Sequence, residues 1–338
     1  MPAVGWANTG RSYESLSERS EGLRQFVALS VFLSRRVRKQ SDIVLLIDEA
    51  EAHLHYDAQA DLVQMLANQN LARQVIYTTH SMGCFPGDFG AGVRVLRTDE
   101  PNGSSEILNK LWIEDGMGLS PILTGMGAET MAFFPFRSCV LTEGAGDILL
   151  LPALLRAAGQ ETLEFHVLPG LAEINGHKIP IIQNSGRHVV FLLDGDEGGD
   201  AIQRKLVREG ISRKIIFRLR SAGGAKCVIE DFISKDVYVA AINAELARSD
   251  RQVRIRSDEL PDVMRAAALE AWCKQHAIRA PAKVAIAYEV IEQMYDKDIV
   301  DRAHIEGLLS TRDHIANVLR AKAAEKKRAT AKAGISSK

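Results

Sequence analysis

Two short apolar runs that end abruptly in carboxylates are the clearest pattern along this chain. The first run ends at Glu143, with Asp147 four residues later, and the second ends at Asp194 and Asp196. Runs of β-forming residues that are apolar throughout are typical of strands buried in a parallel sheet. Because the carboxyl ends of parallel strands meet at one edge of the sheet, the pattern predicts that these acidic side chains gather there.

Apolar runs and helical stretches alternate around these two acidic ends. The predicted strands lie near 138–142, 165–168, 188–193 and 215–219. The predicted helical stretches include 148–158 and 201–209. This alternation favours an α/β fold in which a parallel sheet is covered by helices.

The rest of the chain divides around this central unit. The start of the chain, 1–97, reads as helix, strand, helix, strand and a last strand near 93–96, followed by a turn at 101–103. We therefore expect four parts, namely a first domain at 1–104, a connector at 105–136, the central unit at 137–235, and a helical region with a basic tail at 236–338.

The acidic ends suggest a metal site. Glu143 and Asp147 can converge at a strand-to-helix turn, while Asp194 and Asp196, two apart on an extended chain, are expected to point to the same side. Hard cations such as Mg²⁺ or Mn²⁺ prefer such oxygen ligands, and a pair of them can stabilise both the attacking and the leaving oxygen of a phosphodiester. For either stretch alone, an acidic turn after a buried strand is the other interpretation.

A second group of polar residues follows an upstream apolar strand. Asp48 and Glu49 end the run that begins at Asp42, and His80 follows a second apolar run. In a nucleotidase such a strand places one carboxylate on Mg²⁺ and the next as a base toward water, with the histidine near the γ-phosphate. The alternative is a buried strand with a polar end.

The residues around Glu143, Asp147, Asp194 and Asp196 resemble the TOPRIM (topoisomerase–primase) domain, whose pattern is a strand ending in Glu-Gly and a later strand ending in Asp-x-Asp. The Glu-Gly-x-x-Asp form is similar to the nuclease version in the OLD (overcoming lysogenization defect) family. That resemblance covers roughly 137–235 and implies a Rossmann-like sheet and metal-dependent cleavage of DNA.

The same resemblance extends to two further residues. Glu230 lies where a further metal ligand is expected, although an exposed acidic helix start explains it equally well. Lys283 matches the lysine of a short segment that steadies charge at the cleaved phosphate in the OLD family. An ordinary helix would show the same apolar pattern around Lys283.

The upstream group resembles the C-terminal half of the ABC-type ATPase that precedes TOPRIM in the OLD family. By this resemblance Asp48 and Glu49 are the Walker B pair, 52–55 is the D-loop, and His80 is the switch histidine. The segment 16–25 is similar to a signature motif, with Ser20 and Gly22 placed to face a phosphate at a helix N-terminus. An N-capped helix is the alternative for this segment.

The phosphate-binding loop of such ATPases has no counterpart in the sequence. No G-x-x-x-x-G-K-[ST] motif occurs, and the dipeptide Gly-Lys does not occur once. We therefore expect ATP to bind only if another segment or chain supplies a P-loop. On this interpretation the chain is either the C-terminal piece of a longer product or the complement of a P-loop partner, and it self-associates or binds that partner.

Composition and charge limit how the chain can contact DNA and where in the cell it is expected. The net charge of −1 gives no overall attraction to nucleic acid, so DNA contacts must come from local basic patches. One such patch is the C-terminal tail from Arg320 onward, which a solvated helix would explain equally well. The four cysteines are scattered, no secretory start is visible, and no apolar run approaches the ~20 residues needed to span a bilayer. These features favour a cytoplasmic protein.

The sequence thus predicts a metal-dependent DNA endonuclease of the OLD and TOPRIM type that carries an incomplete ATPase module. The alternative is a non-catalytic assembly subunit that completes the ATP site of a partner ATPase. A decayed gene product is a third interpretation.

Overall fold

In the computed structural model the chain forms two compact units, residues 1–84 and 85–338. The structure describes residues 20–34, 43–86, 92–99, 103–110, 138–159, 163–168, 188–249, 253–294 and 296–335. Residues 16–19 of the signature-like segment and 111–137 of the expected connector therefore lie outside the described residues.

The first unit is a small α/β layer. Its elements are α1 (Glu21–Leu33), β1 (Val44–Ile47), α2 (Tyr56–Ala67), β2 (Gln74–Tyr77) and the short 3-10 helix η2 (Met82–Cys84). Strands β1 and β2 pair in parallel, with Leu46 opposite Ile76. The core forms where α1, α2 and η2 cover the inner face of these strands, around Leu62, Leu66 and Cys84.

The outer face of this two-stranded sheet is apolar and exposed. Leu46 is 70% exposed, and Val44 and Ile76 are each 49% exposed. The inner positions Leu45 and Ile47 pack on the core instead. Parallel strands are normally covered on both faces, so the first unit presents a sheet face of the kind that other proteins bury.

The second unit begins with a β-hairpin. Strands β3 (Val95–Asp99) and β4 (Ser104–Leu108) pair antiparallel, with Leu96 opposite Ile107. Gly103, at φ 63°, supplies the left-handed backbone that the turn needs. The last strand of the first domain was expected near 93–96 and lies slightly later, in the second unit. The connector expected from residue 105 begins inside β4.

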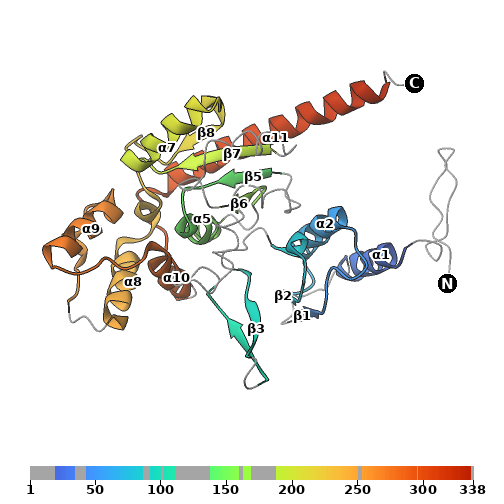
Figure 1. The fold of residues 1–338 in the computed structure, drawn as a ribbon, viewed down its shortest axis with the longest axis horizontal. Coiled ribbons are helices and arrows are strands. Elements are labelled where there is room, and N and C mark those ends of the chain that lie inside the picture. Colours follow the sequence, from blue (N-terminus) through green and yellow to red (C-terminus); the bar gives the residue numbers. More distant parts are fainter. Residues whose placement is uncertain are drawn as a thin grey trace. The chain divides into compact units, whose positions relative to one another are not determined.

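The centre of the second unit is a four-stranded parallel sheet in the order β6-β5-β7-β8. Its strands are β5 (Ser138–Leu141), β6 (His166–Leu168), β7 (His188–Leu193) and β8 (Ile216–Arg218), with α5 (Ala145–Ala157) and α7 (Glu197–Arg208) as crossover helices. Figure 1 shows α5 on one side of this sheet and α7 on the other. The predicted α/β class, parallel sheet and four strand positions are confirmed.

Both crossover helices begin three or four residues before their predicted starts. The first turns contain glycines, at Gly146 in α5 and at Gly198 and Gly199 in α7, and glycine is a poor helix former. A carboxylate compensates at each start. Asp147 accepts a hydrogen bond from the Gly144 amide at 3.0 Å, and Asp196 accepts one from Gly199 at 2.9 Å.

The predicted helical C-terminal region is confirmed. It contains α8 (Lys235–Arg248), α9 (Arg265–Gln275), α10 (Lys283–Gln293) and α11 (Ile305–Ile335), with 3-10 turns η5 (Arg213–Ile215), η6 (Ile229–Phe232) and η7 (Ser257–Glu259) placed before and among them. Helix α10 packs on α5 and α8, and α11 packs along β7 and β8. No helix within the described ranges has the length and apolar character that a membrane crossing needs.

Helix α11 is fixed closely to the loop after β8. A Cβ atom at Gly307 would lie 2.0 Å from the Arg220 carbonyl oxygen, so only glycine allows this approach. The neighbouring Ile305 and Leu308 are buried, and farther along Lys322 donates to the Val189 carbonyl at 3.2 Å.

A buried ion-pair network joins η6 to the helical region. Asp231 is fully buried and accepts hydrogen bonds from the backbone amides of Met264 and Arg265, at 2.8 and 3.0 Å. The Arg265 side chain, also buried, donates to the Ile233 carbonyl and pairs with Asp301 at 2.6 Å. These contacts set where α9 begins relative to η6.

Replacing Arg265 tests how much of the fold depends on this network. We expect Arg265→Ala to cost about 3–5 kcal/mol of unfolding free energy, because it removes a buried guanidinium that pairs with Asp301 and donates to the Ile233 carbonyl. The matched control is Arg256→Ala, whose exposed pair with Asp258 is worth at most about 1 kcal/mol. Urea denaturation followed by circular dichroism measures both, and equal losses in the two variants would show that the buried network has no special role.

Candidate functional site

The predicted carboxylates gather at the carboxyl edge of the four-stranded sheet. Glu143 follows β5 and Asp194 follows β7, the two adjacent central strands of the sheet. The chain leaves β5 toward β6 on one side and leaves β7 toward β8 on the other. In open α/β sheets this switch point opens a crevice that commonly holds ligands. The acidic residues thus lie where the fold itself creates a site.

Backbone amides hold these carboxylates in place. Glu143 Oε1 accepts a hydrogen bond from the Asp194 amide at 2.8 Å, which joins the ends of β5 and β7. Asp194 Oδ1 accepts from the Ile229 amide at 3.1 Å, which fixes η6 against the same edge. Each acid therefore positions the next segment while using one of its two oxygens.

Glu230 and Lys283 complete the group. Glu230 is 4% exposed, and its Oε2 is buried without a hydrogen-bond partner among the described residues. Lys283 Nζ lies 4.0 Å from Glu230 Oε1. The Lys283 side chain is 55% exposed, so it reaches the acids from the solvent side. The predicted ligand position of Glu230 is a buried one, and the alternative of an exposed helix start does not hold.

Burial makes this cluster electrostatically costly. It is the main cause that raises the pKa of Glu143, Asp194 and Glu230, and it raises the pKa of Asp147 to about 7. Repulsion from neighbouring carboxylates adds to the effect, as Glu230 and Glu143 do at Asp147. The Glu230 carboxylate, in turn, raises the pKa of Lys283. A bound proton or cation relieves such strain, and raised carboxyl pKa values in a crevice are typical of functional sites.

Asp196 has a different partner from Asp194. We expected both side chains to face one point, but Asp196 caps the first turn of α7 while Asp194 binds the Ile229 amide. The strand ends at Leu193, so the alternation of an extended strand does not continue through both acids. Asp196 still lies close enough to raise the pKa of Glu143.

The glycines at this edge serve the protein backbone. A Cβ atom on Gly195 would lie 2.6 Å from the Cys227 amide nitrogen, and one on Gly199 would lie 2.2 Å from the Asp194 carbonyl oxygen. These glycines let the β7 edge pack against the 227 loop and the start of α7. Gly144 has open space around it.

Sequence reasoning missed Arg218 and the role of Asp231. Arg218 Nη2 donates to the Asp196 carbonyl at 3.1 Å and Nη1 to Asp200 at 2.7 Å, which anchors the first turn of α7. Its place at the end of β8, on the same sheet edge, is the signal that would have found it. Asp231, next to Glu230, binds the Val228 amide and the start of α9 and does not join the cluster.

The donor atoms are of the kind that a hard divalent cation prefers, but they are not arranged as a metal site. Within the described residues, no three His, Cys, Asp or Glu side chains are arranged to hold a metal ion. Glu143, Asp147 and Asp194 each bind a backbone amide with one oxygen. Their second oxygens and the unpartnered Glu230 Oε2 are the hard donors that Mg²⁺ and Mn²⁺ prefer.

In the first unit, the end of β1 is organised by Thr78. Thr78 Oγ1 donates to Asp48 Oδ1 at 2.5 Å and accepts from the Glu49 amide at 2.8 Å. Glu49 has a left-handed φ of 47°, which turns the chain sharply after Asp48. The acidic pair is therefore held rigidly at the carboxyl edge of the β1–β2 sheet.

The residue just before the predicted D-loop contacts the switch histidine. The His80 amide donates to Glu51 Oε1 at 2.5 Å. Gly22, in the first turn of α1, lies against the D-loop so closely that a Cβ atom would be 2.0 Å from the His53 carbonyl oxygen. Ser20 caps α1 through a 3.5 Å bond from the Leu23 amide. The signature-like serine thus acts here as a helix cap.

The chain is similar to a family of ATPase domains and to two known proteins. Residues 10–84 match the family model of an AAA ATPase domain. The uncharacterized protein MJECL43 of Methanocaldococcus jannaschii is 27% identical over 243 residues, which cover 66% of this chain and 60% of that protein. Septu protein PtuA of Bacillus mycoides is 31% identical over 125 residues, which cover 36% of this chain and 17% of that protein. The chain thus matches less than two thirds of each relative, and its first unit is similar to an AAA-type ATPase domain.

Proposed function

We propose that the second unit is a metal-dependent DNA endonuclease of the OLD and TOPRIM type. The observation that carries the proposal is the group of Glu143, Asp147, Asp194 and Glu230 at the switch point of a parallel sheet. Their pKa values are raised by burial, and a lysine approaches from solvent. If these acids only formed surface turns, they would be exposed to water, and no cation would be needed to relieve repulsion among their carboxylates.

Each residue has a role in this proposal. Glu143, Asp147, Asp194 and Glu230 hold Mg²⁺ or Mn²⁺, which when bound stabilises the charge that builds up on a phosphodiester. Asp196 orders the first turn of α7 and adds negative charge to the same edge. Lys283 supplies a positive charge to the phosphate at the solvent side, where its side chain is half exposed.

The site should respond to metal even without DNA. We predict that Mg²⁺ or Mn²⁺ raises the melting temperature, since metal at about a hundred times its Kd adds about 2.7 kcal/mol to stability. Glu230→Gln and Asp194→Asn should remove most of this gain and abolish metal-dependent nicking of supercoiled DNA. The control is Asp258→Asn, at an exposed acid far along the chain. A wild-type chain that shows neither a thermal shift nor cleavage would refute the nuclease.

The raised pKa of Asp147 gives a pH dependence with a definite sign. Burial raises this pKa from 3.8 to about 7, so the folded chain holds the proton more tightly than the unfolded chain. The stabilising contribution is therefore complete below about pH 4 and is lost as the pH rises through about 7. In EDTA, wild type should lose stability relative to Asp147→Asn between about pH 4 and pH 8. Parallel stability curves for the two proteins would contradict this.

The ATPase-related first unit favours a second candidate role. The observation behind it is the exposed apolar face of β1 and β2, combined with the absence of a P-loop motif from the sequence. In this role the chain is an assembly subunit, and Asp48, Glu49, His80 and the α1 start complete an ATP site whose P-loop lies on another segment or chain.

The isolated chain should therefore be a poor nucleotide-binding protein. We predict weak binding of ATP·Mg²⁺ by calorimetry and negligible hydrolysis, because a P-loop supplies the main contacts to the β- and γ-phosphates. Tight binding with turnover that Glu49→Gln abolishes would show that the chain contains a complete ATPase site.

A further inference from the structure

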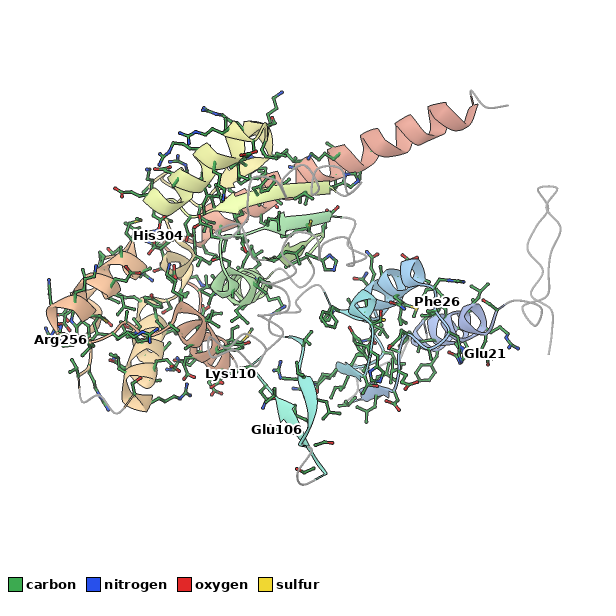
Figure 2. All side chains as sticks on the ribbon, viewed as in Figure 1. Glu21, Phe26, Glu106, Lys110, Arg256 and His304 are labelled. Atoms are coloured by element: carbon green, nitrogen blue, oxygen red, sulfur yellow. The ribbon has the colours of Figure 1, made fainter. Side chains whose placement is uncertain are left out.

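The stretch that follows the acidic edge is strongly basic. Between residues 197 and 226 the cationic residues are Arg204, Lys205, Arg208, Arg213, Lys214, Arg218, Arg220 and Lys226, and the acidic ones are Glu197, Asp200 and Glu209. The chain as a whole has a net charge of only −1. Figure 2 shows nitrogen-tipped side chains along the outer side of the helix that Figure 1 labels α7. This segment of the chain therefore carries an excess of positive charge, part of it on the outer side of α7.

An open pocket lies in this surface. It has a volume of about 390 Å³ and is lined by Asp200, Gln203, Arg204, Val207, Arg208 and Arg213. Arg204 and Arg208 are four residues apart on α7, so they lie on the same face of the helix. Arg213 comes from η5, on the following turn of chain. We call these three residues the arginine pocket.

The one acid that lines the pocket is already neutralised. Asp200 Oδ1 pairs with Arg218 at 2.7 Å, and Asp200 Oδ2 pairs with Lys226 at 3.0 Å. The three guanidinium groups of the arginine pocket have no carboxylate at ion-pair distance in the part of the chain that the structure describes. All three residues are exposed. The pocket therefore presents unopposed positive charge to solvent.

We propose that the arginine pocket binds the phosphate backbone of the DNA that the acidic site cleaves. This inference rests on the proposed nuclease function, and it names the surface along which the substrate lies. Helix α7 starts at the acidic edge and carries the pocket on its second half. At 1.5 Å per residue, Arg208 lies about 18 Å along the axis from Asp196, which corresponds to about five phosphate steps of a duplex strand.

The chemistry of the pocket favours a phosphate backbone over an acidic protein segment. Guanidinium groups bind phosphate oxygens in pairs and remain charged at every physiological pH. Two arginines spaced one helical turn apart match a ligand whose charge repeats at regular intervals. Because the net charge of the chain gives no general attraction, a nuclease of this sequence needs such a local site to hold its substrate.

The test measures binding separately from cleavage. Fluorescence anisotropy in EDTA follows a fluorescein-labelled duplex, and its matching single strand, as they bind the full chain. The triple variant Arg204→Gln/Arg208→Gln/Arg213→Gln should weaken binding at least tenfold and reduce the salt slope of log K by up to about 0.9 per arginine. The control, Arg254→Gln/Arg256→Gln/Lys274→Gln, removes the same charge from exposed positions in the helical region and should bind as wild type does.

Each outcome decides the inference independently of the nuclease proposal. If the triple variant loses DNA binding and the control does not, the result supports DNA binding by the arginine pocket, even if no condition yields cleavage. Equal binding by the triple variant and the control overturns it, even if wild type cuts DNA. Displacement of DNA by polyglutamate of equal charge would also overturn it, because the pocket would then be a general site for acidic partners.

Discussion

Repulsion among carboxylates packed at one edge of a sheet is the constraint on which the second unit depends. Glu143, Asp147, Asp194 and Glu230 come from four segments that meet at the ends of β5 and β7. Amide donors hold three of them, so these acids also tie together the segments that carry them. Burying these charges costs free energy, which contacts elsewhere in the unit must offset. Among them are those of Asp231 and Arg265, which hold η6 against α9.

The first unit combines firmly held acidic residues with an uncovered sheet face. Thr78 holds its acidic pair in place. Glu51, just before the predicted D-loop, binds the His80 amide, and the D-loop itself lies against the start of α1. Yet one face of its sheet is bare, with Leu46 mostly exposed. The acidic edge of this ATPase-like layer thus lies on a sheet whose outer face is apolar and exposed. This combination supports the proposal of an ATP site that is shared with another segment or chain.

The sequence predicts the frame of the second unit well, because buried parallel strands are apolar throughout and their acidic ends stand out. Glu143 and Asp194 follow adjacent strands, as their pattern predicts, because the ends of parallel strands converge by topology alone. Lys283, at the start of α10, came from the family resemblance and not from the strand pattern. What each carboxylate binds could not be predicted. Asp196 caps a helix because that helix starts within a glycine-rich turn that resembles a loop, and this depends on tertiary packing.

The sequence likewise could not predict that one face of β1 is exposed. An apolar strand such as Val44–Ile47 has the same composition whether one face or two are covered, so its pattern indicates burial that the fold does not provide. Asp231 shows the same limit. It stands beside Glu230 in the sequence, but a 3-10 turn sends the two side chains to different partners, one to the acidic cluster and one to α9.

The close packing of Gly307 on the loop after β8 links a distant helix to the acidic edge. That loop leads to Cys227, whose carbonyl accepts a hydrogen bond from the Gly195 amide at 2.6 Å, beside Asp194. The geometry at Asp194 therefore depends on a contact made more than a hundred residues later in the chain. A substitution at Gly307, although far from every acid in the sequence, is expected to disturb the same edge of the sheet.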